Sequence, residues 1–396
     1  MILAGLAALL GAAAVLYAAR LGTFARGLRR VLAQPLPPLP TPPPRVSVVV
    51  PARNEAARLD ACLGALTASS YPASAFEIVV VDDFSTDDTA RIAEGWAARR
   101  PNVRLLRLAG TGLDASAGHK GAALAAGIRA STGTLVLTTD ADCTADAGWV
   151  DALARMFASE AVGFVAGWVR MTPGRSWLGR MQALEFAGLV GVGAGALGAG
   201  DPNMCNSASM AYPRAVFDAL SPADESARTP WDDERLLHAI AAHPTLEARF
   251  CPSFAATVTT TPEPTFSAYF AQRRRWAATG AQYDTPGAAY TARLTWAFNV
   301  LLVAGLPLLA HPRLWPVWPL ALAAKVASEA LVLVPTARRL GLGALLWQVV
   351  PQQLAQVPLT VALGVATLWG QPAWKGRRAS APVARADEAF GEPVLR

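Results

Sequence analysis

The chain has 396 residues, enough for one large or two modest domains, and 53% of them are hydrophobic. Its net charge of +6 gives no reason to expect a nucleic-acid partner, because much of the basic excess flanks apolar segments, where membrane orientation explains it. The four cysteines show no metal-ligand spacing, which indicates free thiols in a cytoplasmic domain.

The start of the chain is apolar and predicts an N-terminal transmembrane anchor over residues 1–20. The first 19 residues carry no charge and are long enough to span a bilayer. Basic residues follow this stretch and do not precede it, which favours a signal anchor over a cleaved signal peptide and orients the next segment towards the cytoplasm. Residues 34–45 are rich in proline and predict a stiff linker.

From residue 46 onwards, predicted strands alternate with predicted helices. Helical apolar spacing is seen around Leu59 and around Ile92, and Ser85-x-x-Asp88 resembles a capping box that opens the second of these helices. This alternation is typical of an α/β domain with a mostly parallel sheet covered on both faces. The short strand-forming runs are 46–50, 78–81, 103–108 and 133–137, and a further helix is expected at 118–128.

Aspartates follow two of these strands. Asp82 and Asp83 end the second, and Asp140 and Asp142 follow the fourth in the sequence T-T-D-A-D. Ligands bind outside the carboxyl ends of strands in such sheets. Two acids one residue apart can hold a hard divalent cation through oxygen and leave its other positions for substrate phosphates. The alternative for an isolated D-x-D is a polar turn.

The second half of this region is less regular. A strand is expected at 163–169 and a helix at 177–190. Gly193-x-Gly195-x-x-Gly198 matches a dinucleotide fingerprint, but it follows a helix and lies in a Gly/Ala-rich run, so we interpret it as composition. Three further motifs come after it: C-N-S-A-S-M at 205–210, W-D-D-E at 231–234 and Q-R-R-R-W at 272–276.

The C-terminal third is apolar again and predicts a membrane region at 293–372, followed by a polar tail at 373–396. Three full spans would put the basic residues after position 374 on the outer side, against the positive-inside rule, so both two and three spans stay open. Lys325 and Glu329 stand four residues apart in one span and could neutralise each other inside a helix bundle.

Six motifs, in this order, resemble the membrane-anchored family 2 glycosyltransferases, whose catalytic domain has the Rossmann-like GT-A fold. They are P-A-R-N-E at 51–55, V-V-V-D-D-F-S-T-D-D-T at 79–89, G-H-K-G-A-A-L-A-A-G at 118–127, T-D-A-D at 139–142, the acid pair of W-D-D-E at 231–234, and Q-R-R-R-W at 272–276. The resemblance covers about 46–280 and implies a cytoplasmic glycosyltransferase domain at 46–285. It is closest to bacterial non-processive lipid glycosyltransferases, and more distant to ceramide glucosyltransferase and to cellulose and hyaluronan synthases. The chain departs from the family pattern where Ser207 and Ser209 replace a glycine and an asparagine, and where Trp231 replaces a glycine.

The resemblance implies a role for each donor-side residue. Asp142 with Asp140 holds Mg²⁺ or Mn²⁺ against the diphosphate, and Asp83 with Asp82 accepts hydrogen bonds from the base or ribose. The implied nucleotide-sugar-binding set is Pro51, Asn54, Glu55, Asp82, Asp83, Lys120, Asp140, Gln272, Arg275 and Trp276.

On the acceptor side, the resemblance assigns the general base to Asp233, with Asp232 as the alternative. A base opposite the leaving group implies direct displacement with inversion. Arg275 is expected to bind the diphosphate and Trp276 to lie near the acceptor, whereas Arg273 and Arg274 are interpreted as an ordinary juxtamembrane basic pair. Cys205, Asn206 and Trp231 are assigned to the acceptor region.

The expected function is therefore that of an inverting, metal-dependent glycosyltransferase embedded in the cell (inner) membrane. It would move a sugar from a nucleotide sugar, with UDP favoured by the resemblance, to a hydroxyl of a membrane lipid at the cytoplasmic face. Two alternatives remain: a processive polysaccharide synthase, and a non-catalytic membrane scaffold that keeps the fold.

Overall fold

The computed structural model describes residues 1–109, 120–220, 233–279, 285–367, 373–374 and 377–378. The chain forms two compact units, which are described separately. The sheet unit comprises 35–169, 205–260 and 376–396, and the helical unit comprises 1–34, 170–204 and 261–375.

The sheet unit is built on a seven-stranded sheet with the order β3-β2-β1-β4-β8-β6-β9. The first four strands in this order are parallel, β8 is antiparallel to both β4 and β6, and β9 is parallel to β6. The predicted mostly parallel sheet is therefore confirmed. The strands are β1 (Val46–Ala52), β2 (Phe76–Asp82), β3 (Val103–Arg107), β4 (Leu135–Thr138), β6 (Val162–Ala166), β8 (Met210–Pro213) and β9 (Glu247–Phe250).

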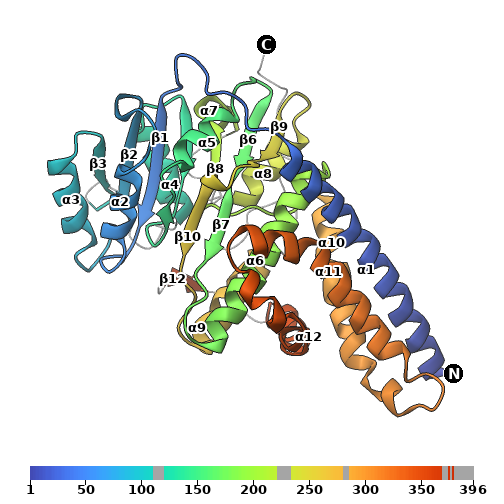
Figure 1. Cartoon of the computed structure of the whole chain (residues 1–396). Coiled ribbons are helices and arrows are strands. Elements are labelled where there is room, and N and C mark those ends of the chain that lie inside the picture. The colour runs from blue at the N-terminus through green and yellow to red at the C-terminus, as the bar shows by residue number, and fades with distance from the viewer. Residues whose placement is uncertain (110–119, 221–232, 280–284, 368–372, 375–376, 379–396) are drawn as a thin grey trace. The chain divides into compact units, whose positions relative to one another are not determined.

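The central strands β1 and β4 are almost entirely apolar because helices cover the sheet. β1 is buried except at Pro51, and every residue of β4 is buried. Figure 1 shows β1, β2 and β3 side by side, with α4 packed on β1 and β2 and with α3 on β2 and β3. The helices of this unit are α2 (Leu59–Thr67), η1 (Ala73–Ala75), α3 (Thr89–Arg99), α4 (Lys120–Ala130), α5 (Trp149–Arg155), α7 (Arg214–Leu220), α8 (Asp233–Ala242) and η2 (Phe254–Ala256).

Two local expectations were wrong. The structure divides the single strand expected at 163–169 into β6 and β7 (Trp168–Met171) around Gly167, where a Cβ would lie 2.2 Å from the Ser209 hydroxyl. β7 joins β5 (Thr144–Ala145) and β10 (Thr257–Thr260) in a small sheet of order β5-β10-β7. Ser85 also does not cap α3, which starts at Thr89 after Asp88; its hydroxyl accepts the Asn54 N–H instead.

The helical unit contains long apolar helices. Among the residues that the structure describes, five helical segments are long and apolar enough to cross a membrane by length and composition: Ile2–Ala33, Trp177–Gly198, Pro286–Ala310, Val317–Arg339 and Gly343–Ala366. Figure 1 shows α1, α10 and α11 as long rods side by side, and α6 packs on both α1 and α11. The elements are α1 (Ile2–Ala33), α6 (Trp177–Gly198), α9 (Phe266–Thr279), α10 (Pro286–Ala304), η4 (Leu306–Ala310), α11 (Val317–Arg339), η5 (Gly343–Gln348), α12 (Val349–Ala366) and the two-residue strand β11 (Ala373–Trp374). The two-residue strand β12 (Arg377–Arg378) belongs to the sheet unit.

The glycines of α6 have a packing role. The helix continues through the Gly/Ala run to Gly198, beyond the expected end at 190, because this run packs directly on α1. A Cβ on Gly195 would lie 2.4 Å from the Phe24 carbonyl oxygen, and one on Gly198 would lie 2.2 Å from that of Gly27. Small residues allow two helix backbones to approach this closely, so the fingerprint-like spacing marks a helix crossing.

The charged pair of α11 is compensated inside the helical unit, as the sequence predicted. Lys325 Nζ lies 2.5 Å from Glu329 Oε1 and donates to Gln353 Oε1 of α12 at 2.6 Å. The Tyr17 hydroxyl of α1 donates to Glu329 Oε1 at 2.7 Å. This network links three helices through polar groups within candidate membrane spans.

Candidate active site

The predicted acids come together at one edge of the parallel sheet. Asp82 is the last residue of β2, and Asp140 follows β4 by two residues. Because β2 and β4 both pair in parallel with β1, their carboxyl ends meet at the same edge. Asp82 and Asp83 are buried, at 2% and 1% exposure, whereas the side chains of Asp140 and Asp142 are about one-third exposed, at 31% and 32%.

Two basic side chains face the carboxylates of Asp140 and Asp142, here called the D-A-D carboxylates. Lys120, at the start of α4, places Nζ 2.5 Å from Asp140 Oδ1 and donates to the Ser207 hydroxyl at 2.7 Å. Arg58 lies 3.7 Å from Asp142 and 4.0 Å from Glu55. Ion pairs therefore connect the segments that follow β1 and β4, and a hydrogen bond from Lys120 connects this edge to the loop before β8.

The loop after β1 is locked to the loop after β2. Asn54 has a φ of 51°, in the left-handed region that asparagine tolerates better than most residues. Its side-chain oxygen accepts the Thr86 N–H at 2.8 Å, while Arg53 Nη1 donates to the Asp83 carbonyl at 2.7 Å. Asn54 thus shapes the rim next to Asp83, and Pro51 lies within β1 just before it.

The donor set after β4 fits a cation that prefers oxygen. Ligand atoms of Asp140, Asp142 and Cys143 all lie within 4.8 Å of one another. Burial raises the pKa of the Cys143 thiol, and the negative charges of Asp140 and Asp142 raise it further. The thiol therefore stays protonated and donates to Asp142 Oδ1 at 3.4 Å. Two carboxylates remain as ligands, which suits Mg²⁺ or Mn²⁺.

The C-N-S-A-S loop is held beside Asp140, and its two serines have different environments. The Ser207 carbonyl accepts the Thr138 hydroxyl at 2.7 Å, and the Ser207 hydroxyl meets Lys120. Ser209 is fully buried and accepts the Trp149 indole N–H at 3.0 Å, so it belongs to the core. Cys205 is half-buried, and Asn206 closes the turn by accepting the Ala208 N–H at 2.9 Å.

The acids of W-D-D-E are only partly described. Trp231 and Asp232 lie outside the described residues, and Asp233 is the first residue of α8. The assignment of the general base therefore stays a prediction.

The Q-R-R-R-W residues lie on α9 of the helical unit. Gln272 Nε2 donates to Glu263 Oε1 at 3.0 Å, and Trp276 is 37% exposed. Desolvation lowers the pKa of Arg275, and the negative charge of Glu263 offsets only part of this effect. Within the described part of the chain, no hydrogen bond or ion pair of Arg275 is found. Arg273 differs from its interpretation as an ordinary juxtamembrane residue, because it is buried and bonded to Glu185 of α6.

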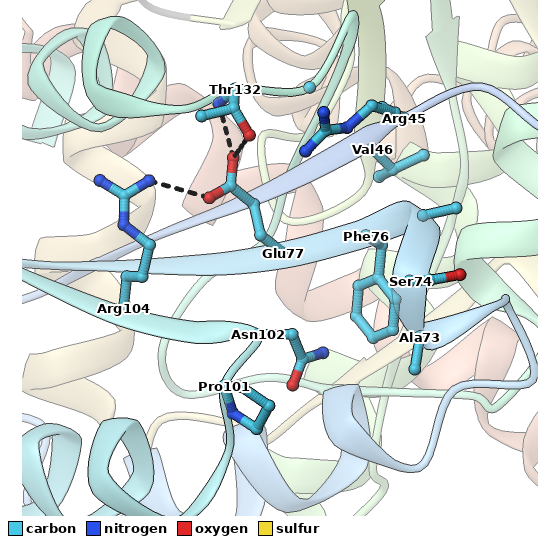
Figure 2. A pocket seen from close by; sticks show the side chains of 12 residues that line it. Arg45, Val46, Ala73, Ser74, Phe76, Glu77, Pro101, Asn102, Arg104 and Thr132 are labelled. Carbon is cyan, nitrogen blue, oxygen red and sulfur yellow. Dashed lines mark hydrogen bonds and ion pairs between the residues drawn. The ribbon is translucent and has the colours of Figure 1, made fainter.

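A hollow of about 310 Å³ lies at the opposite edge of the sheet, beside the first residues of β1 and β2. Figure 2 shows Glu77 at its wall, bonded to Thr132 and Arg104. Glu77 also accepts the Ser47 hydroxyl at 2.8 Å. Burial raises the pKa of Glu77, but these hydrogen bonds together outweigh that effect and lower it. We interpret this network as a structural tie between strands.

Arg58, Ser207 and Glu185 were not identified as site residues from the sequence. Ser207 carried a signal, because it stands where the family pattern has glycine. Arg58 directly precedes α2 and Glu185 lies inside α6, and both meet their partners only in the folded chain, so their sequence surroundings gave no signal.

Comparisons with known proteins agree with this architecture. Residues 47–211 match the model of glycosyl transferase family 2, and residues 135–363 match that of glycosyl transferase family group 2. A mannosyltransferase, PcManGT of Pyrobaculum calidifontis, solved in complex with GDP-Man and Mn²⁺, is 25% identical with a TM-score of 0.53 over 91% of this chain and 99% of that one.

Two curated relatives match shorter segments. Glycosyltransferase AglE of Haloferax volcanii is 32% identical over 129 residues, which are 33% of this chain and 40% of that protein. A dolichyl-phosphate beta-glucosyltransferase of Trichomonas vaginalis is 39% identical over 100 residues, 24% of this chain and 28% of that protein. The similarity to these curated relatives thus spans less than half of their length.

Proposed function

We propose that this chain, which belongs to glycosyl transferase family 2 and is a glycosyltransferase with the GT-A fold, moves one sugar from a nucleotide sugar to a hydroxyl of a membrane lipid. The observation that carries the proposal is the pairing of two accessible carboxylates, Asp140 and Asp142, with Lys120 at the carboxyl edge of the parallel sheet.

This arrangement suits the departure of a nucleoside diphosphate. The leaving group gathers negative charge, which a cation and basic donors stabilise. Asp142 with Asp140 would hold Mg²⁺ or Mn²⁺, which would neutralise the diphosphate when bound. Lys120 lies within ion-pair distance of Asp140 and can place its charge on the same phosphates. The structurally similar mannosyltransferase PcManGT was solved with Mn²⁺ and its nucleotide sugar, which supports metal dependence here.

The nucleoside is proposed to lie against the rim formed by Asp83, Asp82, Asn54 and Glu55. The aspartates are buried at the end of β2, and Asn54 holds the adjoining loop, so the rim is rigid before a ligand arrives. The resemblance favours UDP, whereas the neighbouring mannosyltransferase was solved with GDP-Man. We therefore propose a UDP- or GDP-sugar as the donor class.

Transfer is proposed to proceed by one displacement with inversion. Asp233, with Asp232 as the alternative, would take the proton of the acceptor hydroxyl as that oxygen attacks the anomeric carbon. No carboxylate nucleophile is needed in such a step.

The acceptor is proposed to be a lipid at the cytoplasmic face of the cell (inner) membrane. The family motif with Arg275 and Trp276 lies on α9 of the helical unit, whose other long helices are apolar enough to span a bilayer. Basic residues such as Arg26 and Arg29 at the end of α1 favour a cytoplasmic location for the segment that comes after this helix. The relative named for dolichyl-phosphate supports a lipid acceptor.

The test is transfer by the purified full chain in detergent, from a panel of UDP- and GDP-sugars to extracted membrane lipids, with and without Mg²⁺ or Mn²⁺. We expect a metal-dependent gain of one hexose on a lipid by mass spectrometry, and loss of that product in Asp142→Asn. A ladder of added sugars would replace this proposal with a processive synthase. A product formed equally well with EDTA would overturn the metal assignment.

A further inference from the structure

A buried arginine lies beneath the exposed tryptophan of α9. The Arg273 side chain is only 4% exposed, and its guanidinium carbon lies 4.1 Å from the Trp276 ring centroid and 4.8 Å from that of Tyr269. Trp276 also packs on Phe186 of α6 at 5.9 Å between ring centroids, yet remains 37% exposed. One part of this indole is therefore supported by protein while another is open.

Glu185 of α6 accounts for the burial of this arginine. Its Oε2 accepts from Arg273 Nη2 at 2.7 Å, from Arg273 Nε at 3.0 Å and from the Tyr269 hydroxyl at 3.0 Å. Gln272 Oε1 accepts from Arg273 Nη1 at 2.7 Å. The guanidinium is thus bonded through three of its nitrogens, which leaves it poorly suited to bind a phosphate.

A second anchor stands on the same face of α6, one turn before Glu185. Gln182 is fully buried; its Nε2 donates to the Glu263 carbonyl at 2.9 Å and its Oε1 accepts the Glu263 N–H at 3.0 Å. Glu263 in turn holds Gln272 of α9. α6 therefore fixes both the approach to α9 and the middle of that helix.

We propose that Glu185 is a positioning residue for the acceptor side of the reaction. By holding Arg273 under the Trp276 ring, it fixes the position of Trp276. This inference rests on the proposed function, because it takes Trp276 to lie near the lipid acceptor. Arg273 therefore supports Trp276 and is not itself a ligand-binding arginine.

The physical basis is the cost of burying a charge. A buried guanidinium is stable only with a close partner, and its planar fork fixes the direction of each hydrogen bond. A cation under an indole is also attracted to the ring, which holds the ring in place. Without the Glu185 carboxylate, Arg273 would turn towards water and Trp276 would lose the support beneath it.

The first experiment separates acceptor effects from donor effects. In Glu185→Gln we expect the KM for the lipid acceptor to rise about tenfold, while the KM for the nucleotide sugar stays within twofold of wild type. Glu160→Gln, at an exposed position, is the matched control and should change neither. An equal rise in both KM values would overturn the proposal.

A double variant separates positioning from simple stability. Glu185→Leu with Arg273→Met replaces the ion pair by apolar side chains, a change that often preserves or raises stability. We expect the double variant to keep the wild-type melting temperature but not the wild-type acceptor KM. If it restored both, Glu185 would be a structural residue only.

A third measurement does not depend on turnover. Acrylamide quenching of the Trp276 fluorescence, obtained as the difference between each protein and its Trp276→Phe counterpart, should increase about twofold in Glu185→Gln. If wild type transfers no sugar but this increase is found, the proposed function fails and the positioning contact stands. An unchanged quenching constant would refute the positioning role whatever the activity.

Discussion

Replacing Lys120 with methionine should have opposite effects on the two ligands of the D-A-D edge. Lys120 Nζ lies 2.5 Å from Asp140 Oδ1, so its positive charge competes with a divalent cation for the same carboxylate. The same charge should attract the diphosphate of the donor. Lys120→Met is therefore expected to bind bare Mn²⁺ more tightly and the nucleotide sugar more weakly.

The magnitudes follow from the exposure of the pair. The side chains of Lys120 and Asp140 are 35% and 31% exposed, so water screens their attraction to about 0.5–1 kcal/mol. Removing this competition should tighten Mn²⁺ binding about two- to fivefold. A hydrogen bond to a charged group contributes about 1.5–3 kcal/mol, so the loss of a phosphate contact should weaken donor binding about tenfold or more.

Isothermal titration calorimetry of Mn²⁺ without nucleotide, and then of UDP- and GDP-sugars at saturating Mn²⁺, measures both effects. Arg91→Met is the control, since Arg91 forms an exposed ion pair with Asp88 on α3. If Lys120→Met bound bare Mn²⁺ more weakly than wild type, Lys120 would be orienting Asp140 for the metal, and the competition argument would be wrong.

Three further predictions use other parts of the chain. Asp233→Asn should abolish transfer while leaving donor affinity within about twofold by calorimetry, and full transfer would exclude Asp233 as the base. Glu77→Gln should lower the melting temperature at pH 7, and by a shrinking amount as the pH falls below about 4.3. The pKa of Glu77 is lowered in the folded protein, so its stabilisation is present above the unfolded-state pKa of about 4.3 and is lost as the pH falls through the folded-state pKa; a constant difference across this range would contradict the network. Gly195→Leu should destabilise the fold by about 1–3 kcal/mol through overpacking against the α1 backbone, as measured by thermal unfolding in detergent. Gly188→Leu should have a smaller effect, because a Cβ at Gly188 would meet its nearest neighbour at 3.8 Å.

The sheet and its acidic edge could be predicted because each signal is local. A run of apolar β-formers such as Val46–Val50 predicts a strand buried on both faces. An aspartate directly after a strand must lie at the carboxyl edge of the sheet when the strands are parallel. The positions of the D-A-D carboxylates and of Asp82 at this edge followed from this reasoning alone.

The remaining features depend on contacts between distant segments. Ser85 has the spacing of a cap, but the Asn54 N–H of the neighbouring loop takes its hydroxyl. Glycines after residue 190 predict the end of a helix by propensity, whereas packing on α1 carries α6 to Gly198. Glu185 and Arg273 lie 88 residues apart, and nothing near either one identifies the other.

The close crossing of α1 and α6 also has a consequence for biogenesis. Their bounds, Ala33 and Trp177, are separated by roughly 140 residues, so at usual synthesis rates α1 is made about seven to thirty seconds before its glycine-lined partner. During this interval the α1 surface at Gly27, against which Gly195 packs in the folded chain, has not yet met its partner helix. Newly made α1 therefore depends on lipid or on the insertion machinery until α6 is translated, and slowing translation between the two helices should lengthen that dependence.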